Sequence, residues 1–414
     1  MGRLGRCGSL KKRRNAIISV SKAMKYRLTK FANSIDGQPM FKVLAKVQEM
    51  QRQGKDIVHF EIGDPDFDTP KNIVEAAKEA LDAGKTHYAP SIGVKELRES
   101  IQRATERSRG FKPDLDQILV VPGANMGIYY AVSCLVEPGD EVIVPDPGFP
   151  TYYSVIKACG VNAVRVTLRE ENSFRMNPED VRKAITDKTR LIILNSPQNP
   201  TGSVMTKEEI EEIAQIAKEH DIYIYSDEIY SRMYYAEGVS FRSPSFLDEC
   251  KERTIVANGF SKAFAMTGWR IGALVGPADV IAKMELLLQT TSSCVPPFIQ
   301  YAAIEAVEGD QSAVKMMVSE YKERMQTLVD GLNDIKGIAC LAPGGAIYIF
   351  PNISGTGMTS AEFADFALEK AGVAVLPGTN FGEYGEGYIR MCVVSSREDI
   401  EKGVKRLKEA IEAR

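Results

Sequence analysis

The chain has 414 residues, of which 44 % are hydrophobic and 26 % are charged, and its formal net charge is −3. A chain of this length exceeds the size at which one hydrophobic core usually stops growing, so two domains are expected. The composition is ordinary for a globular protein, and neither a basic surface nor a long apolar run indicates nucleic acid or a membrane as a partner.

Residues 1–30 differ from the rest of the chain in charge. They hold ten of the 52 basic residues and no acidic residue, which leaves 42 basic and 55 acidic residues in the remainder. Three interpretations are open: a disordered tail, a transit-like peptide for an organelle, or translated sequence upstream of a true start at Met24. We favour a tail or a false start, because no clear small-residue cleavage pattern follows the basic residues.

The seven cysteines are scattered along the chain and include no CxxC pair. An odd number without paired spacing predicts reduced thiols in a cytoplasmic protein rather than a disulfide framework or a zinc site. The three histidines lie far apart in the sequence, so we expect no metal centre built on them.

From about Ile118 onward, short β-branched runs alternate with segments of helical period. The runs are ILVV, EVIV, AVRV, LIIL, IYIY, TIVA and GALVG, and residues 207–221 form one of the helical segments between them. Strands that are apolar on both faces and separated by helices predict a parallel α/β sheet. We therefore expect a large domain over residues 66–300, with a mostly parallel seven-stranded sheet flanked by helices.

The C-terminal part of the chain changes character. IYIFPNIS, GVAVLPG and YIRMCVVSS predict strands of a second sheet, while residues 360–372 and 397–414 have the apolar stripe of amphipathic helices. An earlier segment shows helical spacing too and is expected to pack with this part; its apolar residues are Phe41, Leu44, Val47 and Met50. Residues 31–65 and 301–414 thus predict a smaller α+β domain.

Two polar turns follow strands of the predicted sheet, where open α/β sheets bind ligands. After ILVV comes PGANMG, a small-residue turn at a helix start, whose free amides suit a phosphate, although such turns are common. After LIIL comes NSPQNPTG, in which the Asn199 amide is available for a hydrogen bond. Alternatively, Asn199 only caps its own turn.

Charged residues follow the next two strands. Asp227 ends IYIYSD, with Tyr230 one helical turn later, and a carboxylate at the end of a buried strand is costly unless it meets a cation. The alternative is a helix N-cap. Lys262 and Arg270 follow TIVA, and either alone would be an ordinary exposed or ion-paired residue.

Together, these residues form the set that pyridoxal 5'-phosphate requires. A lysine amine can form a Schiff base with its aldehyde, and a carboxylate can pair with its pyridine nitrogen. A phenol and an amide can bond its ring hydroxyl, and an arginine can hold its phosphate. The sequence therefore predicts a site for this cofactor at one edge of the sheet.

The chain resembles the class I aminotransferases of the pyridoxal-phosphate-dependent fold-type I superfamily over about residues 30–410. The motifs that carry the resemblance stand in family order and spacing: FEIGDPDFDTP, HYAPSIGVKELRESI, EPGDEVIVPDPGFPTYY, NSPQNPTG, SDEIY, NGFSKAFAMTGWRIG and VLPGTNFGEYGEGYIRM. The resemblance implies Lys262 as the Schiff-base lysine that also moves the substrate proton, and Asp227 as the pyridinium partner.

The same resemblance implies the remaining cofactor contacts. Asn199 and Tyr230 would bond the ring hydroxyl, and the ring of Phe149 would stack on the cofactor. The implied phosphate ligands are Arg270, Ser261 and the backbone at Ala124 and Asn125, joined by Tyr88 from the neighbouring subunit. A residue shared in this way implies a homodimer.

On the substrate side, the resemblance implies that Arg390 binds the α-carboxylate through its two-pronged guanidinium. Asn199 and the backbone at Gly63 would lie against the substrate as well. Two subgroups of the family supply a second cation for an acidic substrate. This chain has Asn125 at one of these positions and threonine and serine, in QTTSSCVPP, near the other.

The expected reaction is a ping-pong transamination between an L-amino acid and a 2-oxo acid, with 2-oxoglutarate as the expected acceptor. Strict preference for aspartate is not expected, and a neutral or aromatic donor is at least as well supported by the sequence. The alternative is another pyridoxal-phosphate reaction in the same fold, such as that of a β-lyase, a decarboxylase or an oxidase, because fold and cofactor do not determine the outcome.

Overall fold

The structure is a computed structural model that describes residues 27–35, 37–235 and 241–414. Most of the basic N-terminal extension therefore lies outside the described residues. The last residue of that extension, Lys30, is the first residue of α1 (Lys30–Ser34), whose N-terminus is capped by the Thr29 side chain.

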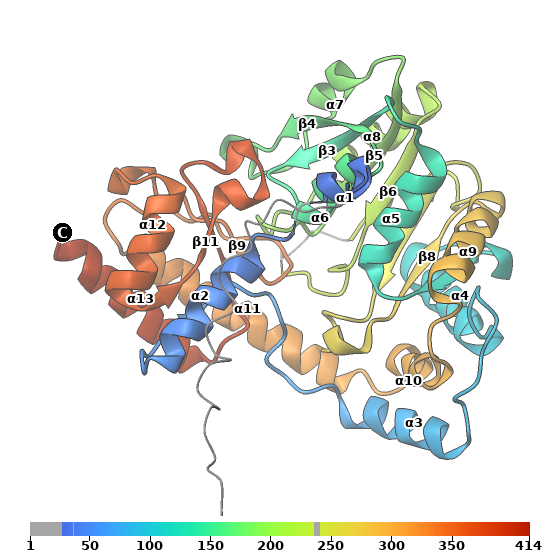
Figure 1. The fold of residues 1–414 in the computed structure, drawn as a ribbon, viewed down its shortest axis with the longest axis horizontal. Coiled ribbons are helices and arrows are strands. Elements are labelled where there is room, and N and C mark those ends of the chain that lie inside the picture. The colour runs from blue at the N-terminus through green and yellow to red at the C-terminus, as the bar shows by residue number, and fades with distance from the viewer. Residues whose placement is uncertain (1–26, 36, 236–240) are drawn as a thin grey trace, which may run out of the picture.

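A seven-stranded sheet forms the centre of the larger part of the molecule (Figure 1). Its order is β2-β8-β7-β6-β5-β3-β4, and only β8 runs antiparallel to its neighbours. The strands are β2 (Ile118–Val121), β3 (Glu141–Asp146), β4 (Asn162–Thr167), β5 (Thr189–Asn195), β6 (Tyr223–Asp227), β7 (Thr254–Gly259) and β8 (Gly272–Val275). Each predicted β-branched run lies in one of them, which confirms the mostly parallel sheet.

Helices cover both faces of this sheet, which explains why its central strands are apolar throughout. Alternate residues enter different cores: Leu119 packs on the face covered by α5, α6 and α9, while Val120 packs on the face covered by α4 and α10. These helices are α4 (Lys95–Arg109), α5 (Ala124–Leu135), α6 (Pro150–Ala158), α9 (Ala278–Ser292) and α10 (Pro297–Glu308). The other helices of this part are α3 (Lys71–Asp82), α7 (Pro178–Ala184) and α8 (Lys207–Glu219).

The helix expected over residues 207–221 is α8, and its N-terminus shows how local sequence sets its start. The Thr206 hydroxyl accepts from the Glu209 amide, and the Glu209 carboxylate accepts from the Thr206 amide in return. This reciprocal cap satisfies two backbone donors that the first helical turn would leave unpaired.

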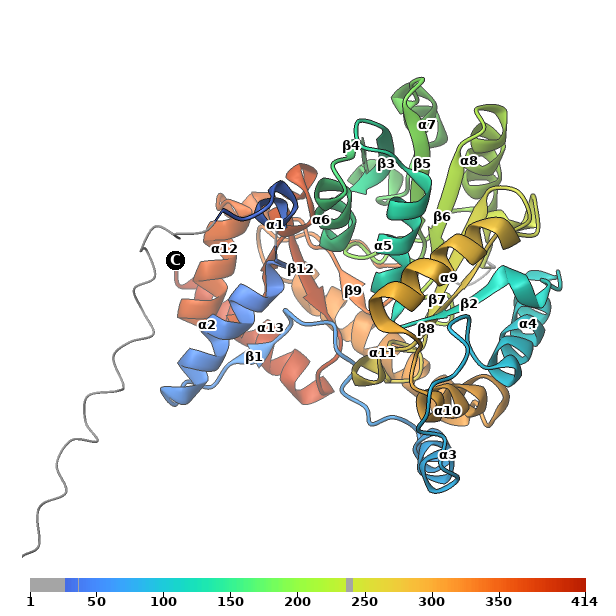
Figure 2. The same ribbon diagram turned by 45° about the vertical axis from the view of Figure 1, so that its right-hand side comes forward.

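A second group of elements lies to one side of the large sheet, where blue and red segments from the two ends of the chain meet (Figures 1 and 2). It contains two small sheets and four helices. The strands are β1 (Val58–His59) paired with β10 (Val373–Ala374), and β11 (Leu376–Pro377), β12 (Ile389–Cys392) and β9 (Tyr348–Ile349) in a three-stranded sheet. The helices are α2 (Met40–Arg52), α11 (Ser312–Asn333), α12 (Ser360–Phe366) and α13 (Arg397–Glu412).

Two details of this group differ from the sequence-based expectation. The helix expected over 360–372 changes to a π-helical turn at Ala367–Ala371. In α2, Val47 and Met50 pack on Leu368 and Ala374 as expected, but Phe41 is 59 % exposed. The division into domains at residues 65 and 300 stays a prediction.

No helix within the described residues is long and apolar enough to cross a membrane. The six cysteines within the described residues are all free thiols.

Candidate active site

A cavity of about 280 Å³ opens at the carboxyl ends of the central strands, between the large sheet and the second group of elements. Eleven of the twelve residues singled out in the sequence line it. They are Gly63, Ala124, Asn125, Phe149, Asn199, Asp227, Tyr230, Ser261, Lys262, Arg270 and Arg390. The exception is Tyr88, which is 89 % exposed and is not part of the cavity wall.

Asp227 ends β6 and is 6 % exposed. Its Oδ2 accepts from the Tyr152 hydroxyl at 2.7 Å and its Oδ1 from the Ile229 amide at 3.3 Å. Burial raises the pKa of Asp227 to about 6, against a smaller lowering by these two donors. A turn, not a helix, follows Asp227, so the carboxylate is not a helix N-cap. It is a buried acid without a basic side chain bonded to it in the described structure.

Lys262 lies on a turn four positions after Asn258 near the end of β7, and its Nζ donates to the Gly63 carbonyl. The turn continues to Arg270, which adopts a left-handed conformation with φ 54°. There the Arg270 guanidinium lies so close to Gly123 that a Cβ at Gly123 would overlap it. The glycine before α5 thus lets an arginine reach the N-terminus of that helix, where amides and guanidinium face the same space.

Tyr230 and Asn199 are held from the opposite side. The Tyr230 hydroxyl shares a hydrogen bond of 2.9 Å with the Tyr348 hydroxyl, and burial followed by this neighbour raises the pKa of Tyr230. The Asn199 backbone amide donates to Asn195 Oδ1 at 2.9 Å, which fixes the turn. The Asn199 side chain is then free to accept from Arg390 Nη1 at 3.3 Å.

Arg390 on β12 is the largest fully buried side chain of the described structure, with 1 % of its surface exposed. Its Nη2 donates to the Glu61 carbonyl at 2.6 Å, and its guanidinium lies over the rings of Tyr348 and Phe381. Its Nε is buried and has no acceptor. Arg390 lines the cavity, and a buried cation with an unused donor at a cavity is prepared for an anionic ligand.

Sequence reasoning missed several residues of the cavity. Tyr152, whose hydroxyl donates to Asp227, stands only three positions after Phe149 in the quoted motif PGFPTYY, so the motif contained the signal. Tyr348 stands in a predicted strand, but only the docking of the second sheet shows that its ring faces Arg390 and Tyr230. Further lining residues that the sequence did not indicate are Gln38, Met40, Phe41, Ile62, Asp64, Asn195, Ile229 and Thr267.

Fold and site together define the class: an α/β protein whose strand ends carry a lysine, a buried carboxylate and two arginines around one cavity. A family model described as aminotransferase class I and II matches residues 55–407, so the chain belongs to that family. This membership confirms the sequence-based expectation of an aminotransferase.

Related proteins agree on the class but differ in the named substrate. An aspartate aminotransferase from Pyrococcus horikoshii is 44 % identical over 89 % of this chain and 95 % of its own length. Aromatic-amino-acid aminotransferase 2 from Thermococcus litoralis is 41 % identical over the same shares of the two chains. The crystal structure of an aromatic aminotransferase from Pyrococcus horikoshii has a TM-score of 0.84 and 41 % identity over 89 % of this chain and 99 % of its own.

Family members use pyridoxal phosphate, and the residues present fit that group. The buried Asp227 matches a protonated ring nitrogen, and the cradle at Gly123 and Arg270 matches a phosphate. The comparisons favour transamination over the alternative reactions of the same cofactor.

Proposed function

We propose that the protein is a pyridoxal-5'-phosphate-dependent aminotransferase that accepts amino donors with an uncharged side chain, aromatic ones included. The observation that carries the proposal is Arg390, buried, with a free Nε, on the cavity that Lys262 and Asp227 share. When bound, the cofactor supplies an aldehyde that bonds the amine and a ring that accepts the electrons of the substrate α-carbon.

The chain's own residues do the rest. Asp227 keeps the ring nitrogen protonated, while Arg270, Ser261 and the amides at Ala124 and Asn125 hold the phosphate. Asn199 and Tyr230, which line the same cavity, would hydrogen-bond the ring hydroxyl, and the Phe149 ring would contact the cofactor. Arg390 orients the α-carboxylate, so that the amine of Lys262 can remove a proton at the α-carbon and return it elsewhere.

The donor class follows from the cations of the cavity. Lys262, Arg270 and Arg390 are the basic side chains among its described lining residues, and each already has a role. Met40, Phe41, Ile62 and the Tyr348 ring also line the cavity, and the remaining polar lining beside them, Gln38 and Asp64, offers no further cation for a side-chain carboxylate. We expect 2-oxoglutarate as the acceptor, held through Arg390.

We further propose a homodimer in which Tyr88 reaches the phosphate of the neighbouring subunit. Its exposure supports this role, because a large aromatic side chain that is 89 % exposed packs on nothing within its own chain. The loop of residues 289–297 contains no cation, so a second subunit would add none from this loop for an acidic donor.

The test is to load the purified protein with pyridoxal phosphate and add each common amino acid singly, without an acceptor. The absorbance should move from that of the aldehyde form to that of the pyridoxamine form, fastest with aromatic and neutral donors. Pyruvate and 2-oxoglutarate are then compared as acceptors. Faster conversion with aspartate than with any uncharged donor would overturn the donor class, and release of ammonia, CO2 or peroxide would overturn transamination.

A further inference from the structure

A second carboxylate follows Asp227 directly and is bonded quite differently. Glu228 is 1 % exposed and lies outside the cavity wall, while Asp227 lines the cavity. Its Oε2 accepts from two nitrogens of Arg109, Nε at 3.1 Å and Nη2, and only 8 % of the Arg109 side chain is exposed. Its Oε1 accepts from the hydroxyls of Ser226 and Ser243 at 2.9 and 2.5 Å. All of its acceptor capacity is therefore engaged.

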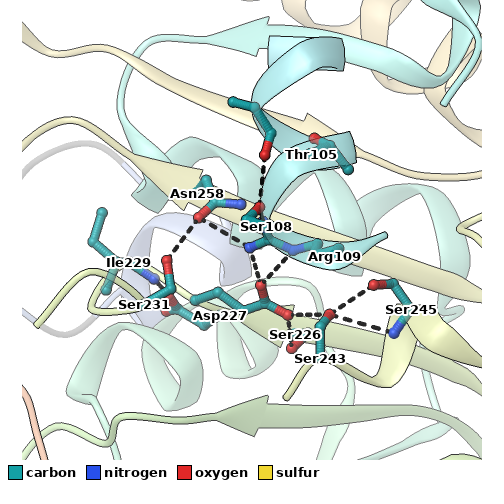
Figure 3. Close-up of polar contacts among 12 residues, drawn as sticks. Thr105, Ser108, Arg109, Ser226, Asp227, Ile229, Ser231, Ser243, Ser245 and Asn258 are labelled. Atoms are coloured by element: carbon teal, nitrogen blue, oxygen red, sulfur yellow. Dashed lines mark hydrogen bonds and ion pairs between the residues drawn. The ribbon is translucent and has the colours of Figure 1, made fainter. Parts of the chain in front are cut away.

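Figure 3 shows this network and where its members come from. Arg109 is the last residue of α4, far from Glu228 in sequence, and its Nη2 also donates to Asn258 Oδ1 at 3.5 Å. The Glu228 amide donates to the Ala257 carbonyl at 2.9 Å. Arg109 thus ties the end of β6, which carries Asp227, to the end of β7, which leads to Lys262.

The negative charge of Glu228 affects the ionisation of its neighbour Asp227. Three hydroxyls lie near Asp227, those of Tyr152 on α6 and of Tyr225 and Tyr230 on its own segment. The other charged side chains that line its cavity are Lys262, Arg270, Arg390 and the acid Asp64. Glu228, the next residue in the chain, raises the pKa of Asp227, after the larger effect of burial. Two adjacent carboxylates can both stay ionised in a buried setting only if one is compensated.

We propose that Arg109 and Glu228 form a positioning pair: Arg109 offsets the charge of Glu228, so that Asp227 remains an ionised partner for the ring nitrogen of the cofactor. The pair touches neither cofactor nor substrate and acts through Asp227. The inference rests on the proposed binding of pyridoxal phosphate.

Opposite charge changes should have opposite effects. Arg109→Gln leaves the charge of Glu228 uncompensated, which disfavours an ionised Asp227. Glu228→Gln removes that charge, and its amide can still accept from Arg109 with oxygen and donate to the two serines with nitrogen. Below the pKa of Asp227, its carboxyl must lose a proton before it pairs with a protonated ring nitrogen, so cofactor affinity falls at low pH.

The experiment measures the dissociation constant of pyridoxal phosphate for the apoprotein between pH 5 and 8. Quenching of Trp269, the one tryptophan of the chain and the neighbour of Arg270, reports binding. We expect the midpoint of the affinity profile to rise by about one pH unit in Arg109→Gln and to fall in Glu228→Gln. A rise of one unit lowers the affinity at pH 5 about tenfold. The double variant Arg109→Gln/Glu228→Gln should return close to the wild-type midpoint.

The matched control is Arg103→Gln, which removes a guanidinium from the same helix α4 where it pairs with Glu308 at 3.0 Å on the surface. It should leave the profile unchanged.

If the pair only holds elements together, both single variants weaken binding at every pH, the midpoint stays, and the double variant is no better. That result would overturn the proposal, as would unchanged profiles in both single variants. If Arg109→Gln fails to fold, Glu228→Gln alone decides. A lower midpoint of the affinity profile in Glu228→Gln, with an unchanged midpoint in Arg103→Gln, supports the proposal, and an unchanged midpoint in Glu228→Gln refutes it. Failure of the wild-type protein to bind pyridoxal phosphate would instead refute the proposed function.

Discussion

The two sides of the cavity are built in different ways. On the side of the large sheet, Asp227 ends β6 and Lys262 lies three residues after the end of the neighbouring parallel strand β7, so the topology brings them together. On the opposite side, most of the chain separates Phe41 on α2 from Tyr348 on β9 and Arg390 on β12. The first side holds the groups proposed to bind the cofactor and move the proton. The second holds Arg390, proposed for the α-carboxylate that every donor carries, and Phe41, which would meet the donor side chain.

Removal of the lysine is the most severe test of the chemical side. Lys262→Ala deletes the amine that bonds the cofactor and moves the proton, and no second lysine lines the cavity among the described residues. We expect loss of the visible absorbance of the bound cofactor and loss of multiple turnover, by at least about 10³-fold in rate. Lys283→Ala, an exposed lysine of α9, is the control and should retain full rate. Retained turnover in Lys262→Ala would remove Lys262 from its role.

On the opposite side, Arg390→Lys tests whether guanidinium geometry or charge alone is needed. Lysine keeps the charge but has neither the fork nor the Nε donor that is unused in the described structure. We expect kcat/KM to fall about 10²-fold, mainly through KM, with cofactor affinity unchanged. Arg406→Lys alters a surface pair with Asp56 and should have no effect. An unchanged KM in Arg390→Lys would show that the α-carboxylate binds elsewhere.

The contrast also explains what the sequence could and could not predict. Seven apolar runs predicted the strands of a mostly parallel sheet, but not their order in it. Polar residues after them predicted that Asn199, Asp227 and Lys262 would lie together, because the carboxyl ends of parallel strands meet at one edge of a sheet. Phe41 was expected in an apolar helix stripe, but it is the second residue of α2 and lines the cavity. Helical periodicity predicts a shared face and cannot predict which neighbour that face will meet.

The buried Asp227 carboxylate is expected to lower the stability of the apoprotein at neutral pH, although the proposed function requires it. A folded-state pKa of about 6 lies above the ordinary value of 3.8, so the folded state holds the proton more tightly than the unfolded state does. The contribution of this group to stability is therefore greatest at low pH and is lost as pH rises from about 4 to 6.

Asp227→Asn should remove that loss while keeping the size of the side chain. We expect the apoprotein variant to be more stable than wild type above pH 6, by about 1 to 2 kcal/mol in the free energy of urea unfolding, and less active once loaded. The exposed Asp187→Asn is the control and should not change the pH dependence. A variant curve parallel to wild type from pH 4 to 8 would show that Asp227 titrates normally in the folded apoprotein.

The smallest expected effect concerns the substrate side alone. Phe41 is 59 % exposed in this chain yet lines the cavity near the buried Arg390, where it can cover an apolar donor. Phe41→Ala should lower kcat/KM about threefold to tenfold for an aromatic donor, because roughly half a phenylalanine ring of contact is lost. It should leave kcat/KM for alanine nearly unchanged, since a methyl side chain is too short to reach that ring. Met316→Ala, similarly exposed on α11, is the control and should alter neither value. Equal losses for both donors would show that Phe41 supports the fold of the N-terminal segment and does not select the donor, and the difference between the two sides of the cavity would then rest on Arg390 and Tyr348.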